Sequence, residues 1–295
     1  MSEGAALHTT SLARPGVAPA LDLNYTMRLQ KIGLNPTLVA GLVLLGVVAL
    51  AGLVAPLLTP YDPIAQNLGE AFRPPLSANH ILGTDNFGRD IWSRIVYSTR
   101  LDLQIALLSV LFPFTFGSLM GIATGYLGGR LDAYFMRVVD VLMAFPFLVL
   151  VVAIMSILGP GLANLYIAFS VVGWIPYTRI TRGETLATRN LEYVLAARTI
   201  GCSSARIMLR HILPNVIAPG LVYVFTGMVL AILTGATLSY LGLGPQPPAA
   251  EWGAMIAAGR QFLLQAWWMT ALPGFALLVL GVALSLIGDG LAERR

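Results

Sequence analysis

The chain has 295 residues, of which 57% are hydrophobic and only 11% are charged. About a quarter of the residues of a soluble domain are charged, so this composition favours a membrane protein, with the buried core helices of a large soluble protein as the alternative. The single cysteine, Cys202, excludes an intrachain disulfide and a multi-cysteine zinc site. The net charge of +4 does not indicate nucleic-acid binding, because the basic residues are confined to short segments between apolar runs.

Stretches without Asp, Glu, Lys or Arg organise the chain, and they run over 32–61, 103–129, 141–178, 211–250 and 261–288. A helix that spans a bilayer needs about 20 apolar residues, and its backbone polar groups must be paired internally. The run 141–178 is too long for one span, and Gly159-Pro160-Gly161 predicts a break within it. The composition therefore predicts an all-α membrane protein with six transmembrane helices, at 37–58, 103–126, 136–158, 162–179, 216–241 and 268–288.

Arginine and lysine are distributed unevenly among the connections between these spans. With the N-terminus inside, thirteen of them fall in inner segments and five in outer segments. Cytoplasmic loops carry an excess of these residues, so both termini are predicted to be cytoplasmic. The predicted divisions are a cytoplasmic tail 1–36, a first span 37–58, an extracytoplasmic loop 59–102, a core 103–290 with a cytoplasmic segment 180–215, and a tail 291–295.

The cytoplasmic segment 180–215 reads as two short helices. Asn190 is expected to cap the first helix, and Gly201 to end it in a left-handed conformation. Ser203 or Ser204 is expected to cap the second. Connections of 2–8 residues suffice between helices, whereas this one exceeds thirty. The length favours a docking element for a cytoplasmic partner, and the alternative is a solvated connector whose arginines only set the topology.

The second short helix is expected to end before the next span, because Pro214 disfavours helix at Leu213 and suits a helix start. This segment resembles the cytoplasmic coupling motif of ABC importer permeases, in which two alanines, a glycine and a closing Leu-Pro recur at fixed spacing. Two positions depart from the motif: Leu195 stands in place of Glu, and His211 in place of Ile. The resemblance implies a role in coupling to an ATPase for Glu192, Leu195, Ala196, Ala197, Arg198, Gly201, Arg206, Arg210, Leu213 and Pro214.

Further stretches resemble the dipeptide, oligopeptide and nickel class of these permeases, C-type subunit, over roughly residues 36–290. They are HILGTDNFGRDIWSRIVYSTR at 80–100, FLVLVVAI after DVLMAFP, RHILPN, and LSYLGLGPQPPAAEWGAMIAAGR at 238–260. The resemblance implies the type I ABC importer permease fold, in the plasma (inner) membrane of a bacterium or archaeon. It also implies as partners a second homologous permease, two cytoplasmic ABC ATPases and an extracytoplasmic solute-binding protein.

The implied function is ATP-driven import of di- or oligopeptides, and nickel-chelate or opine-type import stays open as an alternative. No catalytic, cofactor-binding or metal-binding residue is expected in this chain, with ATP and Mg²⁺ bound by the ATPase subunits. A P-loop needs GxxxxGK, and Lys31, the only lysine, has no such glycine loop before it. A stand-alone secondary transporter or channel would need ionisable groups inside the spans, which hold almost none.

A membrane enzyme is the third alternative, and it would need a base at membrane depth. All three histidines, at 8, 80 and 211, fall outside the predicted spans. Asp140 is expected to pair with Arg137 or Arg130 rather than to touch substrate. Candidate pathway or gate residues are Asp140, Phe145, Pro146, Gly235 and Ser239, the fourth standing where the class often has Glu.

Two further groups of residues are predicted to have structural roles. The outer loop is expected to be held by Asp–Arg pairs among Asp85, Arg89, Asp90 and Arg94, and 246–262 to cap the pathway. Glycines at 117, 121, 125 and 128–129 give the second span a small-residue face, which predicts close helix packing.

Overall fold

The computed structural model describes residues 35–293. Expectations for the tail up to residue 34, with His8 and three of the inner basic residues, lie outside the described residues, as do those for Arg294 and Arg295. The described helices are α1 (Pro36–Leu53), α2 (Ala55–Leu58), the 3-10 turn η1 (Leu68–Glu70), α3 (Ile91–Leu127), α4 (Gly129–Met143), α5 (Phe147–Leu158), α6 (Leu162–Val172), α7 (Trp174–Thr188), α8 (Glu192–Thr199), α9 (Ser204–Ile207), the π turn η2 (Met208–Ile212), α10 (Leu213–Tyr240), α11 (Trp252–Gly259), the 3-10 turn η3 (Arg260–Phe262) and α12 (Trp268–Ala292).

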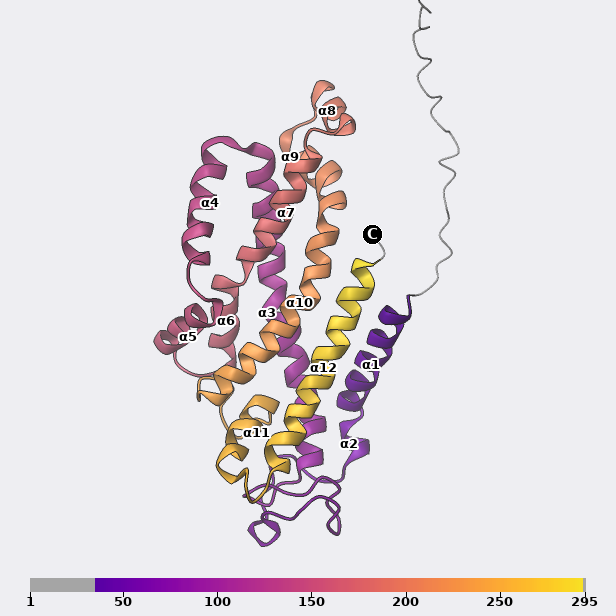
Figure 1. Ribbon diagram of the computed structural model, residues 1–295, viewed down its shortest axis with the longest axis vertical. Helices are drawn as coiled ribbons and strands as arrows, with labels where there is room; N and C mark the ends of the chain where they lie inside the picture. Colours follow the sequence, from indigo (N-terminus) through magenta and orange to yellow (C-terminus); the bar gives the residue numbers. More distant parts are fainter. Residues whose placement is uncertain (1–34, 294–295) are drawn as a thin grey trace, which may run out of the picture. The chain divides into compact units, whose positions relative to one another are not determined.

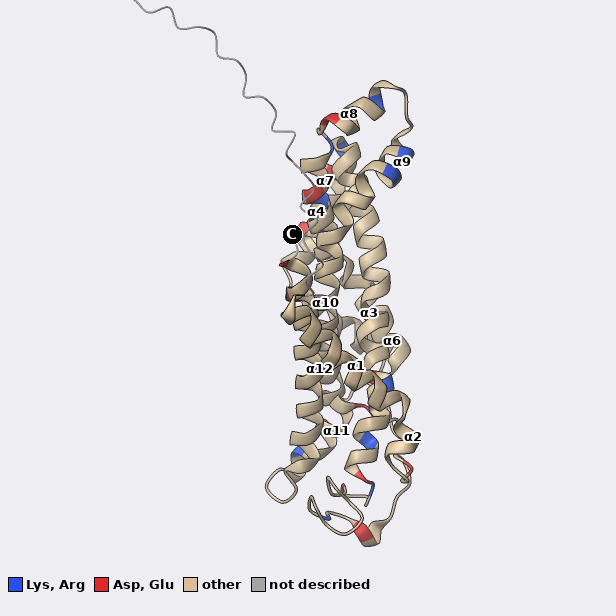
Figure 2. Ribbon diagram, turned by 90° about the vertical axis from the view of Figure 1, so that its right-hand side faces the viewer, with Lys and Arg blue, Asp and Glu red and all other residues tan. Residues whose placement is uncertain are grey.

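The long helices α3, α10 and α12 run side by side, and α1 packs along α12 (Figure 1). Helices α8 and α9 project at one end, drawn at the top, whereas α11 and the loop between α2 and α3 lie at the other. Figure 2 shows the charged residues gathered largely toward these two ends of the ribbon, with a mostly uncharged band between them. That distribution is the one a bilayer imposes, because unpaired charge is costly in hydrocarbon.

Four helical stretches are long and apolar enough to cross a membrane: Pro36–Leu53, Ile91–Leu127, Ser204–Tyr240 and Trp268–Ala292. The pair α4 and α5 makes a fifth if it counts as one span, but it bends by 87°. The continuous helix expected at 136–158 is therefore wrong, because two helices at a sharp angle cover these residues. Pro146 stands at the bend and caps α5, and a proline has no N–H to continue the hydrogen-bond ladder of α4. The count of six spans and the cytoplasmic termini stay predictions.

Three other boundaries differ from expectation. The first span is broken at Val54, because Pro56 interrupts the ladder and starts α2. The helix of the second span begins at Ile91 rather than 103, so the last part of the expected outer loop is helical. The fourth continues to Thr188 in two pieces, α6 and α7, that meet at Gly173.

Helix α3 packs most extensively against α7, through three of its glycines. A Cβ at Gly117 would lie 2.9 Å from Cβ of Tyr177, and one at Gly121 would lie 2.5 Å from the carbonyl oxygen of Thr178. The Thr178 hydroxyl donates to the carbonyl of Gly117 at 3.1 Å. The predicted close packing at 117, 121 and 125 is confirmed, whereas Gly128 and Gly129 instead adopt a positive φ at the turn into α4.

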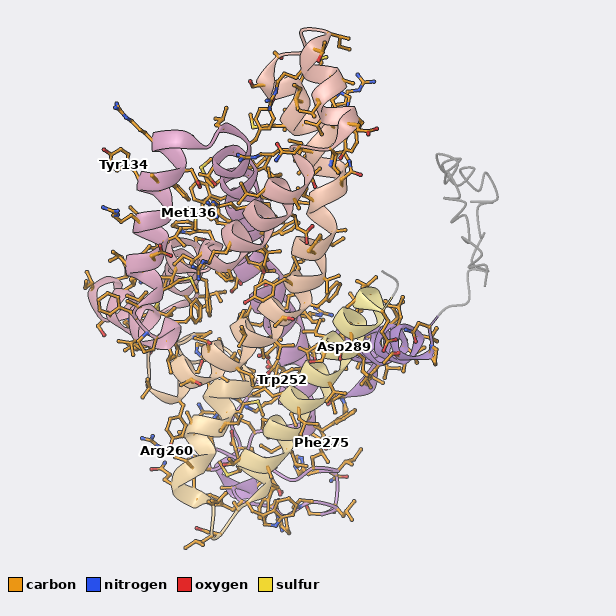
Figure 3. All side chains as sticks on the ribbon, turned by 45° about the horizontal axis from the view of Figure 1, so that its top comes forward. Tyr134, Met136, Trp252, Arg260, Phe275 and Asp289 are labelled. Carbon is orange, nitrogen blue, oxygen red and sulfur yellow. The ribbon has the colours of Figure 1, made fainter. Side chains whose placement is uncertain are left out.

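The largest apolar core lies between α3, α6, α10, α11 and α12. Trp252 is almost fully buried in it, and its indole N–H donates to the carbonyl of Ile95 at 3.1 Å. Figure 3 shows Trp252 inside the helices and Tyr134 pointing away from α4. The core thus holds the helices at the α11 end, while α4 stands apart from it.

Candidate functional site

Residues 190–215, called here the coupling segment, form a helical hairpin beyond the end of α7. Gly201 has φ +81°, the left-handed conformation that glycine adopts without strain, as predicted. Ser203 caps α9 by accepting from the backbone N–H of Arg206 at 3.4 Å. The expected cap of α8 is wrong: Leu191 takes that position without a side-chain bond, because Asn190 lies in the turn that leaves α7.

The second helix of the hairpin does not end before the next span. It runs from α9 through the π turn η2 into α10, so the expected break at Leu213 is wrong. The backbone N–H of Leu213 donates to the carbonyl of Met208, five residues back. Pro214 has no N–H to offer, and one π turn lets the helix pass it while the neighbouring groups remain bonded. Helix α9, the π turn and α10 therefore form one continuous helical stretch.

One face of the coupling segment packs against the end of α3. Val194, Ile207 and Ile212 are buried together with Ile122 and Tyr126 of α3. The Arg198 guanidinium lies over the Tyr126 ring at 5.4 Å from its centroid, which is close enough for a cation–π contact. The hairpin is therefore attached to the helix bundle rather than hanging free.

The other face, called here the exposed face, combines apolar and basic side chains. Ile200 is 79% exposed, and Leu195, which replaces the glutamate of the motif, is 43% exposed. Its members are Leu191, Glu192, Tyr193, Leu195, Ala196, Ile200, Arg206, Leu209, Arg210 and Pro214, all exposed. Large apolar side chains clustered on a projecting polar end are typical of a protein–protein contact. Of the predicted coupling residues, Ala197 is buried instead and Leu213 is half-buried.

Two ion pairs tie α4 to α7. Arg182 Nε lies 2.6 Å from Asp132 Oδ1, and its Nη2 lies 2.7 Å from Oδ2. This hydrogen-bonded guanidinium holds the pKa of the Asp132 carboxyl below its ordinary value. Arg179 Nη2 lies 3.2 Å from Asp140 Oδ1, with both side chains about half exposed.

The expected pairing of Asp140 with Arg137 or Arg130 is therefore wrong. Arg137 is one turn away on the same helix and points to solvent, whereas Arg179 reaches across from α7. The pairing of Asp132 with Arg182 was missed. In the sequence, the pair is indicated only by opposite charges near the ends of two predicted spans. The two side chains meet because α4 and α7 pack antiparallel in the folded protein.

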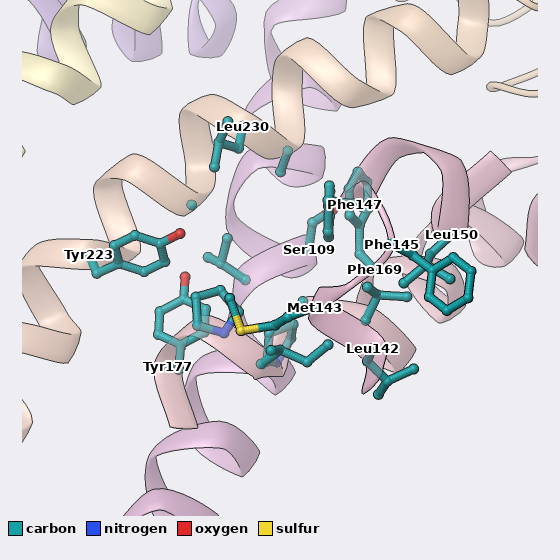
Figure 4. A pocket seen from close by; sticks show the side chains of 18 residues that line it. Ser109, Leu142, Met143, Phe145, Phe147, Leu150, Phe169, Tyr177, Tyr223 and Leu230 are labelled. Atoms are coloured by element: carbon teal, nitrogen blue, oxygen red, sulfur yellow. The ribbon is translucent and has the colours of Figure 1, made fainter. Parts of the chain in front are cut away.

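A cavity of about 390 Å³ lies between α3, α7, α10 and the elbow that joins α4 to α5. Phe145, predicted to line the pathway, lies in its wall (Figure 4). The other predicted pathway residues lie elsewhere. Asp140 faces Arg179, Gly235 packs near Ile105, and Ser239 lies under Gly244, while Pro146 forms the bend itself.

The outer loop is held by ion pairs among the residues named for that role. Arg89 Nε lies 2.6 Å from Asp85 Oδ2, and Arg94 Nε lies 3.9 Å from the same oxygen. Asp90 caps α3 by accepting from the N–H of Ser93 at 2.7 Å. Its other oxygen lies 2.9 Å from Nδ1 of His80. These buried contacts tie the loop to the start of α3.

Two buried carboxyl groups meet at the N-terminus of α11, an arrangement the sequence did not indicate. Glu251 accepts from the N–H groups of Gly253 and Ala254, each at 2.7 Å. Asp102 accepts from the N–H of Trp252 at 3.3 Å. The N-terminal N–H groups of a helix favour such acceptors. The contact fixes α11 against α3.

Comparison with known proteins agrees with this architecture. A family profile described as binding-protein-dependent transport system inner membrane component matches residues 117–295, and one described as the N-terminal TM domain of oligopeptide transport permease C matches residues 33–75. The chain is 44% identical over 254 residues to a putative peptide transport system permease protein of Brucella suis biovar 1, covering 86% of this chain and 85% of the relative.

The chain is also 39% identical over 269 residues to the di/tripeptide transport system permease protein DppC of Pseudomonas aeruginosa, covering 90% of this chain and 89% of that protein. A solved structure of the MetNI methionine ABC transporter in an inward facing conformation has a similar fold. Its TM-score is 0.54 at 19% identity, and the match covers 69% of this chain and 96% of that one.

Apolar helices of spanning length, joined by a projecting hairpin, define a multi-pass transport permease of the inner membrane. The chain belongs to the binding-protein-dependent transport system inner membrane component family, and within it to the C-type permeases of ABC importers. The resemblance to the C-type permeases of ABC importers is thus confirmed.

Proposed function

We propose that this chain is a transmembrane subunit of an ATP-driven importer that moves di- or oligopeptides into the cytoplasm. The names of relatives at about 40% identity over most of the chain support the substrate class. The observation that carries the coupling mechanism is the exposed face, because it is apolar and basic on a hairpin whose opposite face is fixed to α3.

Two cytoplasmic ATPase subunits supply the work, and they bind the ATP and Mg²⁺. One ATPase contacts the exposed face. When it moves, α8 displaces α7 and the α9 helix displaces α10, since each is joined to its neighbour by a turn or a continuous helix. Rigid-body movement of these helices switches access to a central path.

The remaining partners are a second permease that completes the path and an extracytoplasmic solute-binding protein that delivers the peptide. The loop held by Asp85, Arg89 and Arg94 lies at the end opposite the hairpin, where such a protein would dock. Substrate specificity resides largely in the binding protein, and the permease transports the peptides that this protein delivers.

The test compares Gly201→Asp with Gly242→Asp in the complete transporter reconstituted in proteoliposomes. Both glycines have φ near +80°, and a Cβ at either meets no atom within 4 Å, so the two substitutions introduce similar backbone strain. They lie at opposite ends of the molecule. Uptake of radiolabelled Ala-Ala and stimulation of ATP hydrolysis by the loaded binding protein are measured together.

Gly201→Asp is expected to abolish uptake and to disconnect it from ATP hydrolysis, because the new side chain enters the contact with the ATPase. Gly242→Asp is expected to keep both. Unchanged uptake and unchanged ATPase stimulation in Gly201→Asp would refute the coupling role. Uptake of a nickel chelate, with none of Ala-Ala, by the wild-type transporter would refute the peptide assignment.

A further inference from the structure

Helix α11 is attached to one side of α3, at the end of the molecule opposite the coupling segment (Figure 1). The indole N–H of Trp252 donates to the carbonyl of Ile95 at 3.1 Å, and its backbone N–H donates to Asp102 at 3.3 Å. Between them, the hydroxyl of Ser98 lies 3.8 Å from Sδ of Met255. The three α3 positions share one helix face, because they are three or four residues apart. Of these contacts, only the one at Asp102 involves a group that gains or loses a proton near neutral pH.

The opposite side of the α11 N-terminus packs closely on α10. A Cβ at Gly253 would lie 2.5 Å from Cα of Ala236, so the two backbones are nearly in contact. Helix α11 therefore joins α3 to α10 at this end of the molecule. Because α10 is continuous with α9 of the coupling segment, the attachment of α11 bears on how α10 is held relative to α3.

Two buried carboxyl groups interact directly at this junction. Asp102 and Glu251 are 1% and 2% exposed, and each accepts from backbone N–H groups at the start of α11. Two ionised carboxyl groups side by side repel each other, and burial removes the water that would screen them. A pair in this situation is stable when it holds one proton between its two members.

No basic side chain in the described part of the chain forms an ion pair with either carboxyl group. Helices α1, α2, α10 and α11 contain no charged residue, and the one in α12, Asp289, lies near the end remote from α11. The nearby arginines are bound elsewhere. Arg100 donates to carbonyls at the end of α1, and Arg260 lies over the Tyr240 ring, 4.8 Å from its centroid.

The charged groups of the outer loop and of the first turn of α3 are also bound to one another. Arg89 and Arg94 both lie beside Asp85, at 2.6 and 3.9 Å. Asp90 lies 2.9 Å from Nδ1 of His80. These contacts leave no positive charge to compensate a second negative charge at the α11 junction, so a shared proton is the remaining means of neutralising it.

The hydrogen bonds indicate which carboxyl group carries the proton. Glu251 accepts from two backbone N–H groups, each at 2.7 Å, whereas Asp102 accepts from one at 3.3 Å. Hydrogen bonds from N–H groups favour the ionised form of a carboxyl group, and the positive end of the helix dipole adds to that preference. The negative charge therefore belongs on Glu251 and the proton on Asp102.

We propose that Asp102 keeps its proton at neutral pH, donates it in a hydrogen bond to Glu251, and by this bond holds α11 against α3. When α11 opens, water reaches Asp102, and a hydrated aspartic acid loses its proton at about pH 4. Above that pH the closed form binds one more proton than the open form, so rising pH favours opening. The inference goes beyond the proposed function, because this pH-sensitive attachment does not depend on which solute is carried.

The first experiment measures hydrogen exchange of the backbone amides of residues 252–254 in the complete transporter in proteoliposomes, between pH 6 and pH 8. Wild type is compared with Asp102→Asn, which keeps an acceptor oxygen and has no proton to release in this range. Asp62→Asn is the matched control, since Asp62 is exposed and its carboxyl accepts from the N–H of Ile64 at 2.9 Å. The intrinsic chemistry of exchange changes with pH equally in all three proteins.

Protection of these amides in wild type, relative to Asp102→Asn, is expected to fall about tenfold for each pH unit, the dependence for one proton. The ratio between wild type and Asp62→Asn is expected to stay constant, as are the contributions of His80 and the other outer groups, which are the same in all variants. A ratio between wild type and Asp102→Asn that does not change with pH would overturn the inference.

The second experiment needs no variant. The infrared spectrum of the wild-type transporter at pH 7 is expected to contain the carbonyl band of a protonated carboxylic acid. Growth with aspartate labelled with a heavy carbon isotope in its side-chain carboxyl group is expected to move that band to lower frequency, whereas labelled glutamate should leave it in place. Absence of the band, or a shift with glutamate alone, would refute the assignment of the proton to Asp102 while leaving the peptide assignment untouched.

Discussion

Arg182 of α7 and Asp132 of α4 form a two-point ion pair, with both hydrogen bonds 2.6–2.7 Å long. Helix α4 packs against α6 and α7 through an apolar cluster that includes Val139, Val172 and Ile175, and this pair and the one between Arg179 and Asp140 add polar contacts with α7. Because α7 leads into the coupling segment, the pair connects the elbow over the cavity to the end that would meet an ATPase.

The contribution of this pair can be isolated with Arg182→Lys, Asp132→Asn and the double variant. Lysine cannot offer two parallel N–H donors, so we expect a coupling free energy of about 1 kcal/mol in thermal unfolding in detergent. The Asp132 carboxyl has a lowered pKa in the folded state. Its contribution is therefore present above the unfolded pKa of about 4 and is lost as the pH falls through the folded value. A coupling energy that already declines between pH 7 and pH 5 would contradict this assignment.

The contact between α3 and α7 should not tolerate even one methyl group at Gly121. A Cβ there would lie 2.5 Å from the backbone oxygen of Thr178 and 2.9 Å from the backbone nitrogen of Arg182, so α7 would have to move. Gly121→Ala is expected to lower the free energy of unfolding by about 1–3 kcal/mol. Gly46→Ala is the matched control, since no atom lies within 4 Å, and it should be neutral or slightly stabilising. Equal melting temperatures for the two variants would contradict the close approach.

The two carboxyl groups at α11 predict opposite results for two changes at Asp102. Asp102→Asn keeps an oxygen that can accept from the N–H of Trp252 and cannot place a second negative charge beside Glu251, so stability should be kept or increased. Asp102→Ala removes the acceptor and should cost about 1–3 kcal/mol. Thermal unfolding of both variants measures the difference. If asparagine is as damaging as alanine, the charge at this position is required and our interpretation is wrong.

Pro214 should matter more for coupling than for folding. Pro214→Ala restores a backbone donor, so the π turn can revert to α-helix, which would rotate α9 by about 100° relative to α10. We expect the melting temperature to be kept or raised, and ATP hydrolysis to lose its link to uptake. Pro219→Ala is the control, because Pro219 lies inside α10 beyond the π turn. Identical coupling in the two variants would show that the π turn has no role in it.

Much of this architecture was predictable from the amino-acid sequence. Apolar runs without charge located the long helices, because the solvation of each side chain is largely a local property. Gly201 and Ser203 marked the turn and the cap of the hairpin for the same reason: their effect depends on backbone conformation within a few residues.

Other features depend on neighbours far away in the chain. Helix α3 extends through Arg94 and Asp102 because Asp85 and the N-terminus of α11 satisfy their polar groups, and a window over residues 91–102 contains neither partner. The partner of Asp140 is likewise Arg179, 39 residues on, rather than a neighbour on its own helix. Pairing across helices thus explains the early start of α3 and the partner of Asp140.

The amino-acid sequence therefore determined which residues form the long helices and the hairpin, and tertiary packing determined the cavity between the helices. The cavity at the elbow is lined by residues of α3, α6, α7, α10 and the α4–α5 elbow, several of which are distant in the chain. No local property of those segments specifies their contact, because close packing, unlike hydrophobicity, is a relation between surfaces that meet only in the folded protein.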